Sequence, residues 1–349
     1  MKRTLLLGIF ISFLAGLGFA QTDLQTVAVV NLIRSEPITV RQLRTEVERM
    51  EQAAGRTLNQ TERRQVLDVI INERLAVQAA ERDRVTVTDN EVNQQIQQMR
   101  VSMAQMLGRQ PTEAEFNQAL REESGMDLPA FREQLKRQMT TQKYLMSKKE
   151  NLFSAIKIPT EEEIRSTFSL ARAQFVRPET VRFSMIQIPF GSDAASRTRA
   201  RDLGNSLIRE IGSNSSKFDE VVARGQAPNS GYEAGDGGFL PRNLEAQAVV
   251  GQEFINIAFS LKQGEISRLI EGVPGTGYQI IKITETYSMR NLELNDILQL
   301  GTSMTVRDYI GSVLLQERQQ IVLAQATEEL ITELRRGNPF RVMDNNLNW

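Results

Sequence analysis

The side chains that most enzymes use for nucleophilic and metal chemistry are missing from this chain. Its 349 residues include no histidine and no cysteine. Serine–histidine and cysteine–histidine nucleophile pairs are therefore excluded, and the usual zinc and iron sites lose their imidazole or thiolate ligands. General acid–base work would fall to Asp, Glu, Lys or Tyr. We expect no metal and no other cofactor, and the range of possible reactions is narrow.

A glycine-rich segment, Ala234-Gly-Asp-Gly-Gly-Phe239, invites comparison with a phosphate-binding loop. It lacks the lysine and hydroxyl of a P-loop, and it does not lead from a strand into a helix. Glycine more often serves to give a turn its positive φ. We therefore predict a loop from Gly231 to Gly238 without a bound phosphate.

Methionines gather in one part of the chain and suggest a binding surface. Six of the 12 methionines lie in one stretch, at Met99, Met103, Met106, Met126, Met139 and Met146. The first three share a helix face by their spacing, and Phe116 follows on the next expected helix. Unbranched, polarizable side chains adapt to varied partners, although they also fill helical cores. We predict a surface for apolar segments at Met99, Met103, Met106 and Phe116.

The elements that position these residues fall into a helical first part and a mixed second part. A short strand is expected at Val27–Val30. Helix starts are marked by capping residues at Thr39, Thr61, Thr88, Thr112, Asp127 and Thr160. From about Pro178 to Tyr287, strand-like and helical stretches alternate in a compact α+β pattern. A long helix, about Met304 to Arg336, and a short strand, Phe340–Met343, end the chain. We expect this strand to pair with Val27–Val30, because each is too short to be stable alone.

The first twenty residues are typical of an export signal. Lys2 and Arg3 precede an apolar run, Leu5–Phe19, and Ala20 offers a small residue for cleavage before Gln21. The run is shorter than the roughly 20 residues of a spanning helix. Retention as a membrane anchor is the alternative. Because no cysteine can carry a disulfide or a lipid, we expect a periplasmic protein that meets the membrane only through this signal.

Charge does not indicate a nucleic-acid partner. Lys plus Arg is 42 and Asp plus Glu is 43, which gives a net charge of −1. The two signs are mixed along the helical stretches, as on solvated helix faces. No basic patch with interleaved aromatic residues is visible, so binding to nucleic acid is not expected.

The second part resembles the parvulin-type (PpiC-type) prolyl isomerases in the order and spacing of its motifs. The matching stretches are Arg182-Phe-Ser-Met-Ile186, Lys217-Phe-Asp-Glu-Val-Val222, Ala234-Gly-Asp-Gly-Gly-Phe239, Phe254-Ile-Asn-Ile-Ala-Phe-Ser-Leu261, Gly264-Glu-Ile-Ser267 and Gly277-Tyr-Gln-Ile-Ile-Lys282. The resemblance covers about residues 178–287. It implies a compact α+β domain with an apolar pocket for a prolyl ring.

The polar centre of that family is replaced in this chain. Ser184 and Gln279 stand at the two histidine positions, and Ala227 stands near the position of the family's cysteine or aspartate. The apolar pocket residues survive as Phe254 and Phe259. The resemblance therefore implies an isomerase frame in which no catalytic residue is expected.

The flanking regions resemble those of SurA-type periplasmic chaperones. Val27-Ala-Val-Val-Asn31, Val85-Thr-Val-Thr-Asp-Asn-Glu91 and Glu161-Glu-Glu-Ile164 occur in the expected order around one parvulin unit. The implied fold class is α+β: a mostly helical chaperone core with an inserted parvulin-like domain. The expected parts are a signal at 1–20, a helical region at 21–177, the parvulin-like domain at 178–287, and a carboxy-terminal region at 288–349 that packs on the helical region.

The function implied by this resemblance is that of a holdase chaperone for unfolded exported proteins, especially outer-membrane proteins. Two alternatives stay open at this stage. One is a peptidyl-prolyl isomerase with a histidine-free site, since that reaction needs no covalent step. The other is an assembly factor anchored by its first segment.

Overall fold

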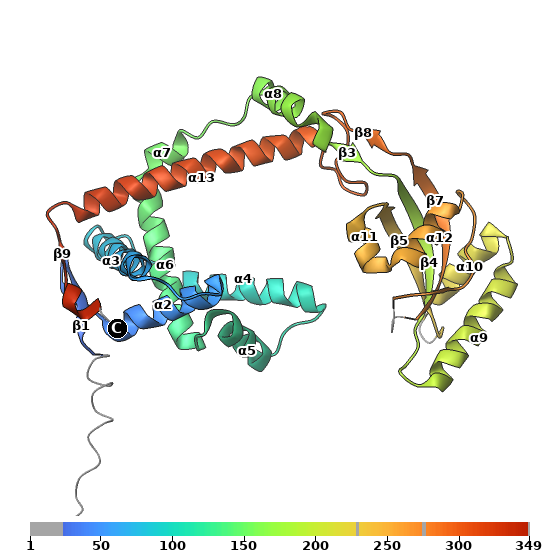
Figure 1. Ribbon diagram of the computed structural model, residues 1–349, viewed down its shortest axis with the longest axis horizontal. Coiled ribbons are helices and arrows are strands. Elements are labelled where there is room, and N and C mark those ends of the chain that lie inside the picture. Colours follow the sequence, from blue (N-terminus) through green and yellow to red (C-terminus); the bar gives the residue numbers. More distant parts are fainter. Residues whose placement is uncertain (1–23, 228–229, 274–276, 348–349) are drawn as a thin grey trace, which may run out of the picture. The chain divides into compact units, whose positions relative to one another are not determined.

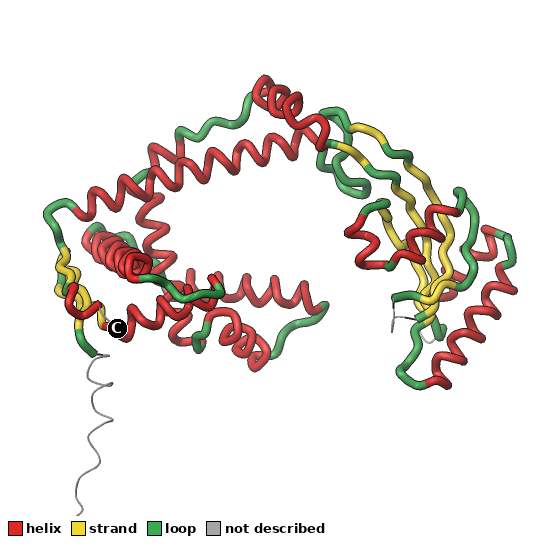
Figure 2. Tube along the Cα trace, in the orientation of Figure 1, coloured by secondary structure: helices red, strands yellow, loops and turns green. Residues whose placement is uncertain are grey.

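The computed structural model describes residues 24–227, 230–273 and 277–347, so the expected signal segment lies outside the described residues. The chain divides into two compact units. One consists of the residues up to Ile156 together with those from Arg318 onward, and the other is Lys157–Glu317. Figures 1 and 2 show the first as mainly helical and the second as a mixture of strands and helices. The expected α+β class, with a helical chaperone core, is confirmed.

The first unit combines a small sheet with helices. Its strands are β1 (Thr26–Asn31), β2 (Ser35–Thr39) and β9 (Phe340–Val342), in the order β2-β1-β9. Its helices are α2 (Val40–Ala54), α3 (Gln60–Arg82), α4 (Asp89–Leu107), α5 (Glu113–Ser124), α6 (Leu128–Lys148), α7 (Glu150–Ser154) and the later part of α13 (Val306–Arg335), and a 3₁₀ turn η2 (Asp344–Leu347) follows β9.

Strand β1 lies between two partners from opposite ends of the chain (Figure 1). It pairs antiparallel with β2, and it pairs with β9 in the register Ala28↔Val342 and Val30↔Phe340. Two further backbone bonds, from Asn31 N to Pro339 O (2.7 Å) and from Met343 N to Val27 O (2.8 Å), extend the second ladder. The expectation that the two terminal strands pair is confirmed.

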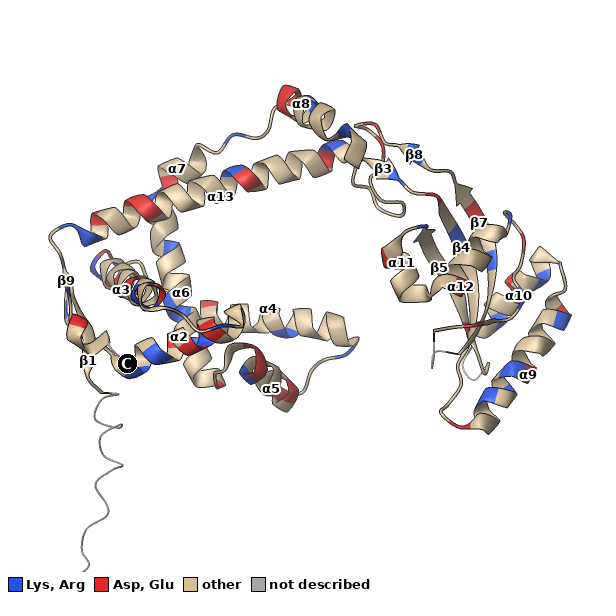
Figure 3. Ribbon diagram, in the orientation of Figure 1, with Lys and Arg blue, Asp and Glu red and all other residues tan. Residues whose placement is uncertain are grey.

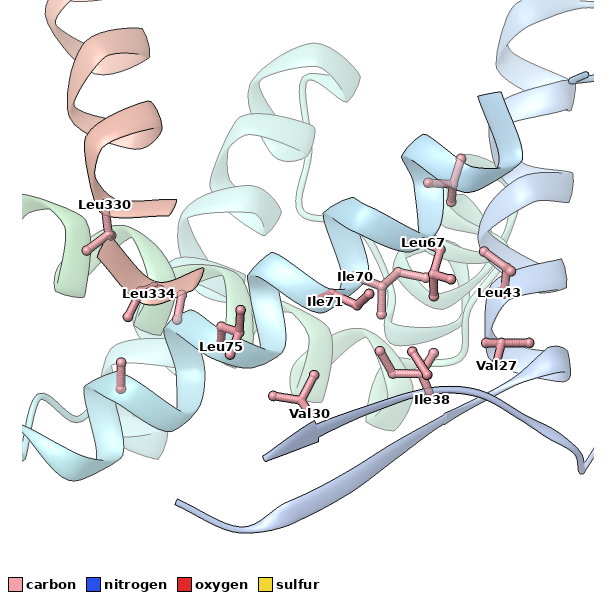
Figure 4. Packing of buried hydrophobic residues seen from close by; sticks show 14 of the residues in the cluster. Val27, Val30, Ile38, Leu43, Leu67, Ile70, Ile71, Leu75, Leu330 and Leu334 are labelled. Atoms are coloured by element: carbon pink, nitrogen blue, oxygen red, sulfur yellow. The ribbon is translucent and has the colours of Figure 1, made fainter. Parts of the chain in front are cut away.

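The core of the first unit lies between this sheet and the helices (Figure 4). Strand residues Val27, Val30 and Ile38 meet the apolar face of α3, including Leu67 and Ile71, and each of these is fully buried. The end of α13 joins the same cluster through Ala326, Leu330 and Leu334. A buried ammonium also fixes this helix, because Lys149 Nζ donates to Glu329 (3.1 Å) and Glu333 (2.8 Å).

A buried glutamine ties the turn between β1 and β2 to helix α3. Gln78 is fully buried, and its Oε1 accepts hydrogen bonds from the backbone N–H groups of Leu32, Ile33 and Arg34 at 3.1–3.4 Å. Its Nε2 donates to Glu36 at 3.0 Å. One side chain thus satisfies the donors of a turn that has no helix or strand to accept them.

Helix starts follow the predicted capping residues with one exception. Thr39, Thr88, Thr112 and Thr160 each form a reciprocal capping box, and Asp127 caps α6. The prediction of Thr61 as a cap was wrong. Asn59 caps α3 instead, because its side chain accepts from Glu62 N while Glu62 bonds back to Asn59 N.

The second unit is built on a four-stranded antiparallel sheet of order β5-β4-β7-β6. Its strands are β3 (Val176–Arg177), β4 (Thr180–Ile188), β5 (Glu233–Pro241), β6 (Ile270–Glu271), β7 (Tyr278–Tyr287) and β8 (Arg290–Asn291), where β3 and β8 form a separate pair. Its helices are α8 (Glu161–Ala171), the 3₁₀ turn η1 (Arg172–Gln174), α9 (Ala194–Ile211), α10 (Ser215–Gly225), α11 (Leu244–Val250), α12 (Gln252–Ser260) and the start of α13.

The predicted glycine loop is a strand, so that prediction was wrong. Strand β5 pairs with β4 from Thr180↔Pro241 to Gln187↔Glu233, and a bulge lies near Gly238, whose φ is 78°. A Cβ at Gly237 would overlap the Phe183 ring. The glycines therefore serve close packing of an aromatic ring on backbone and the bulge itself.

The compact second unit extends beyond the expected domain of residues 178–287 on both sides. Ile164 and Phe168 of α8 pack with Leu292, Val306 and Ile310 in a separate apolar cluster. The segment from 288 to 317 therefore belongs with this unit, whereas we expected all of 288–349 to pack on the helical region. Sequence periodicity does not show which neighbour covers an apolar face.

Truncation after Gly337 tests the closure of the first unit by β9. Loss of this strand frees one edge of β1 and uncovers core residues, so we expect the free energy of unfolding of the first unit to fall by about 3 kcal/mol or more. Hydrogen exchange followed by mass spectrometry should then quicken in β1 and α3. The internal control is β4 and β7, whose exchange should not change. Unchanged protection of β1 would contradict this account of the fold.

Candidate functional site

The sheet of the second unit separates two apolar clusters. On one face Ile186, Ile188 and Ile280 pack with α9 and α10, around Leu207 and Phe218. On the other face the apolar residues of β4 and β7 pack with α12, and this cluster comprises Val181, Phe183, Leu240, Phe254, Ile255, Ala258, Ile270, Ile281 and Ile283. A prolyl pocket built on Phe254 and Phe259 must therefore lie on the α12 face.

The two positions proposed for the missing histidines lie on opposite faces of the sheet. Ser184 pairs with Lys282, whose ammonium bonds to Ser215 and Asp219 of α10. Gln279 lies two residues before the buried Ile281 on β7, so both side chains face α12. Met185, one residue beyond Ser184, packs in the α12 cluster. Shifting the motif alignment by one residue moves the position to the other face of the sheet. Met185, and not Ser184, is therefore the β4 residue on the same face as Gln279 and the expected prolyl pocket.

The remaining pocket residues are covered. Phe254 is 3% exposed, and its ring meets that of Phe183 with a centroid separation of 5.5 Å. The Arg242 guanidinium lies 5.3 Å from the centre of the Phe259 ring and pairs with Glu179 at 2.8 Å. The Phe254 ring therefore belongs to the core, and the Phe259 ring is partly covered by the Arg242 side chain.

The polar groups near this frame have structural partners. Gln279 Nε2 donates to Gln187 Oε1 at 2.9 Å, and neither amide titrates near neutral pH. Tyr232 donates its hydroxyl to Val221 O at 3.0 Å. Asp236 pairs with Arg182 at 2.7 Å, and this guanidinium lowers the pKa of the carboxyl. Ala227 is exposed just after α10. Among the described residues, Gln279, Tyr232 and Asp236 are thus each engaged in a structural hydrogen bond or ion pair.

The methionine cluster divides between core and surface. Met99 and Met103 are partly buried beside Phe116, which is 4% exposed and lies 4.3 Å from the Arg100 guanidinium. Met106, at the end of α4, is 82% exposed. Phe116 is therefore a core residue of the α4–α5 hairpin in this conformation, because α4 and α6 cover the inner face of α5.

A groove between the start of α4 and helix α6 adds two more methionines. It has a volume of about 310 Å³ and is lined by Val87, Glu91, Met139, Gln142, Lys143 and Met146. Met146 is 44% exposed. Sequence reasoning did not single out this groove. The sequence feature that could have indicated it is the seven-residue spacing between Met139 and Met146, which places both side chains on one face of α6.

Ion pairs border the groove and continue along the hairpin. Lys143 Nζ bonds to Glu91 Oε1 at 2.8 Å, and Lys136 Nζ bonds to Asp89 Oδ1 at 2.7 Å. The Lys143 ammonium, together with the Thr88 backbone N–H, lowers the pKa of Glu91 to about 2. Figure 3 shows basic residues on α6 and acidic residues on α5. The rim of the groove is thus charged but internally neutralised.

Two searches of the described residues were negative. In residues 24–227, 230–273 and 277–347, no group of three or more acidic side chains is placed to hold a metal ion. Over the same ranges, no helix has both the length and the apolar character that crossing a membrane requires.

Family comparisons agree with the two-unit architecture. Residues 1–145 match the SurA-like N-terminal domain, and residues 159–298 match the PPIC-type PPIASE domain. The chain is thus a SurA-like amino-terminal domain joined to a PPIC-type domain, and a single parvulin domain fits this match. Over these two domains it is similar to the SurA-like chaperones. The resemblance drawn from the sequence motifs is confirmed.

Similar proteins carry the name Chaperone SurA. The protein from Saccharophagus degradans is 25% identical over 362 residues, covering 100% of this chain and 80% of its own length. The protein from Pseudoalteromonas translucida is 24% identical over 273 residues, covering 76% and 60%. Among solved structures, one of the SurA-like chaperones of Campylobacter jejuni (PEB4 and Cj1289) has a TM-score of 0.38 at 13% identity, covering 91% of this chain and 99% of that one.

Isomerase activity should be negligible. On the face of the sheet that carries the expected pocket, the two central positions are Met185 and Gln279, and neither side chain titrates near neutral pH. Phe254 is buried. In a proline-peptide assay, the rate with this protein should equal the uncatalysed rate. A rate as high as that of a histidine-bearing parvulin, lost on substitution of Gln279 by Leu, would contradict this prediction.

Between about pH 2 and pH 8, the stability of the first unit should depend on pH only at the acid end. The Arg109 guanidinium and the Thr112 backbone N–H lower the pKa of Glu115 to about 2, and Glu91 behaves alike, against an ordinary value of 4.5. Carboxylates with lowered pKa stabilise the fold above pH 4.5, and this contribution is lost as the pH falls toward 2. Urea unfolding should give a constant midpoint at about pH 6 to 8, since histidine is absent.

The matched control for the acid effect is Glu91→Gln with Glu115→Gln, because glutamine also forms a capping box. This variant should lose less stability between pH 4.5 and 2.5 than the parent. An equal loss in both proteins would show that other carboxylates govern the acid response.

Proposed function

We propose that this chaperone is a periplasmic holdase that binds apolar segments of unfolded exported polypeptides, outer-membrane proteins among them. The observation that supports this proposal most directly is the exposure of large apolar side chains in the α4–α6 region. Met106 is 82% exposed at the tip of α4, beside Leu107 at 46%. Contiguous exposed apolar surface usually marks a binding site, and Val101, Met106 and Leu107 are all exposed within seven residues of α4.

The proposed client-binding surface has two parts, both in the first unit. The tip comprises Val101, Met106 and Leu107 of α4, and the groove is the one lined by Val87, Met139 and Met146. Flexible methionine side chains repack around different partners, which suits clients of varied sequence. Two weak contact points on one module also raise the overall affinity for an extended chain.

Holding an unfolded chain requires no chemistry, and this agrees with the second unit. The frame of that unit is retained while its pocket is covered by Arg242 and Phe183. The isomerase alternative is thus not favoured by the geometry. The periplasmic site of action and cleavage before Gln21 are proposals that depend on the signal-like residues 1–20 and on the SurA-like relatives. The anchored alternative concerns residues outside the described ranges, and the mass of the mature protein decides between the two.

Replacement of two exposed methionines tests the client-binding surface. Met106→Ser combined with Met146→Ser should reduce suppression of client aggregation by about threefold or more, because about 1 kcal/mol of apolar contact is lost at each site. The measurement is light scattering of an unfolded outer-membrane protein after dilution from urea.

The matched control is Met289→Ser combined with Met304→Ser. These methionines belong to the second unit and are 69% and 47% exposed, so the same chemical change is made at similar exposure. The control should protect clients as well as the parent. Equal protection by both double variants would place the client surface elsewhere.

A further inference from the structure

A small apolar cluster, separate from the main core, lies between the α4–α5 hairpin and α6. Its buried members are Val87, Val92, Ile96 and Phe116, and around them pack the partly buried residues Met99, Met103, Leu128, Phe131, Leu135 and Met139. The main cluster of the first unit contains many more buried residues, from β1 to the end of α13. A small satellite cluster opens at a lower free-energy cost than the core of its domain.

The outer attachment of the hairpin to α6 is electrostatic. Lys136 pairs with Asp89 and Lys143 pairs with Glu91, and the side chains are 37–78% exposed. The guanidinium of Arg132 donates to Asn93 Oδ1 at 2.6 Å. Exposed pairs of this kind contribute little stability and are weakened by salt. They align the hairpin on α6 but do not lock it there.

The closed arrangement also leaves a polar atom of the hairpin unsatisfied. Among the described residues, Asn117 Oδ1, next to Phe116 on α5, is buried without a hydrogen-bond partner. This atom disfavours the closed state if opening admits water to it. Residues 125–127, where Gly125 has a φ of 71°, form a short connection between α5 and α6 at which movement could occur.

We propose that the α4–α5 hairpin swings away from α6 as a unit, and that its inner surface then takes an apolar segment of an unfolded client. This inference rests on the proposed holdase function and gives its site a gate. The inner residues are uncharged, and the two nearby lysines, Lys136 and Lys143, already pair with Asp89 and Glu91. The inner surface therefore suits an apolar segment, which replaces the apolar contacts that opening breaks. Phe116, Met99 and Met103 become client contacts only in the open state.

The opening can be measured without a client, because the chain contains no cysteine. A single thiol is placed in the hairpin by Val92→Cys or in the main core by Val66→Cys, where the parent valines are 2% and 4% exposed. The rate of labelling by a thiol reagent under native conditions reports each opening. We expect the thiol at 92 to react at least about tenfold faster than the thiol at 66, since local opening precedes global unfolding.

Salt and charge removal sharpen the assay. Lys136→Gln with Lys143→Gln, or 0.5 M NaCl, should raise labelling at 92 by about threefold while leaving labelling at 66 unchanged. Addition of an unfolded outer-membrane protein should slow labelling at 92, because the bound segment covers the thiol. A folded protein at the same concentration is the control and should have no effect.

The outcomes separate the gate from the function. If the chain suppresses aggregation but its thiols at 92 and 66 label equally slowly, the holdase function stands and the hairpin gate is overturned. If the thiol at 92 labels fast but an unfolded client leaves its rate unchanged, the hairpin opens without serving clients, and the proposed client site on its inner face is overturned.

Discussion

The pairing of β1 with strands on both of its sides is the constraint on which the first unit depends. Strand β2 follows β1 directly, whereas β9 arrives from the far end of the chain. Side chains of β1 pack into the main core. Gln78 accepts hydrogen bonds from the turn that aligns β1 with β2. Each of these short strands would be unstable alone, so the sheet forms only when the two ends of the chain meet.

This closure explains how one chain can carry a second unit without disturbing the first. The end of α13 returns the chain to the first unit, where Leu330 and Leu334 enter the main core and Lys149 pairs with Glu329 and Glu333. The second unit has its own clusters on both faces of its sheet. Because each unit has a core of its own, residues on one face of the inserted sheet, such as Met185 and Gln279, can differ without disturbing the first unit.

Local signals in the sequence predicted much of the fold, and long-range packing accounts for most of the misses. Capping boxes at Thr39 and Thr88 and the pairing of the terminal strands followed from short motifs and from the need to satisfy edges. The strand character of β5 did not, because one of its glycines, Gly237, is required by the Phe183 ring, which lies on another strand. The burial of Phe116 depends on two neighbouring helices, and the face of Ser184 depends on a register that motif alignment sets only to within a residue.

The central claim is that clients bind to the α4–α6 region of the first unit. Single cysteines in place of Met106 and of Met289, each carrying a benzophenone photo-crosslinker, test it most directly, since both parent side chains are well exposed, at 82% and 69%. With an unfolded outer-membrane protein as the client, the crosslinker at 106 should capture it and the crosslinker at 289 should not. Equal capture at both positions, or capture at 289 alone, would contradict the account.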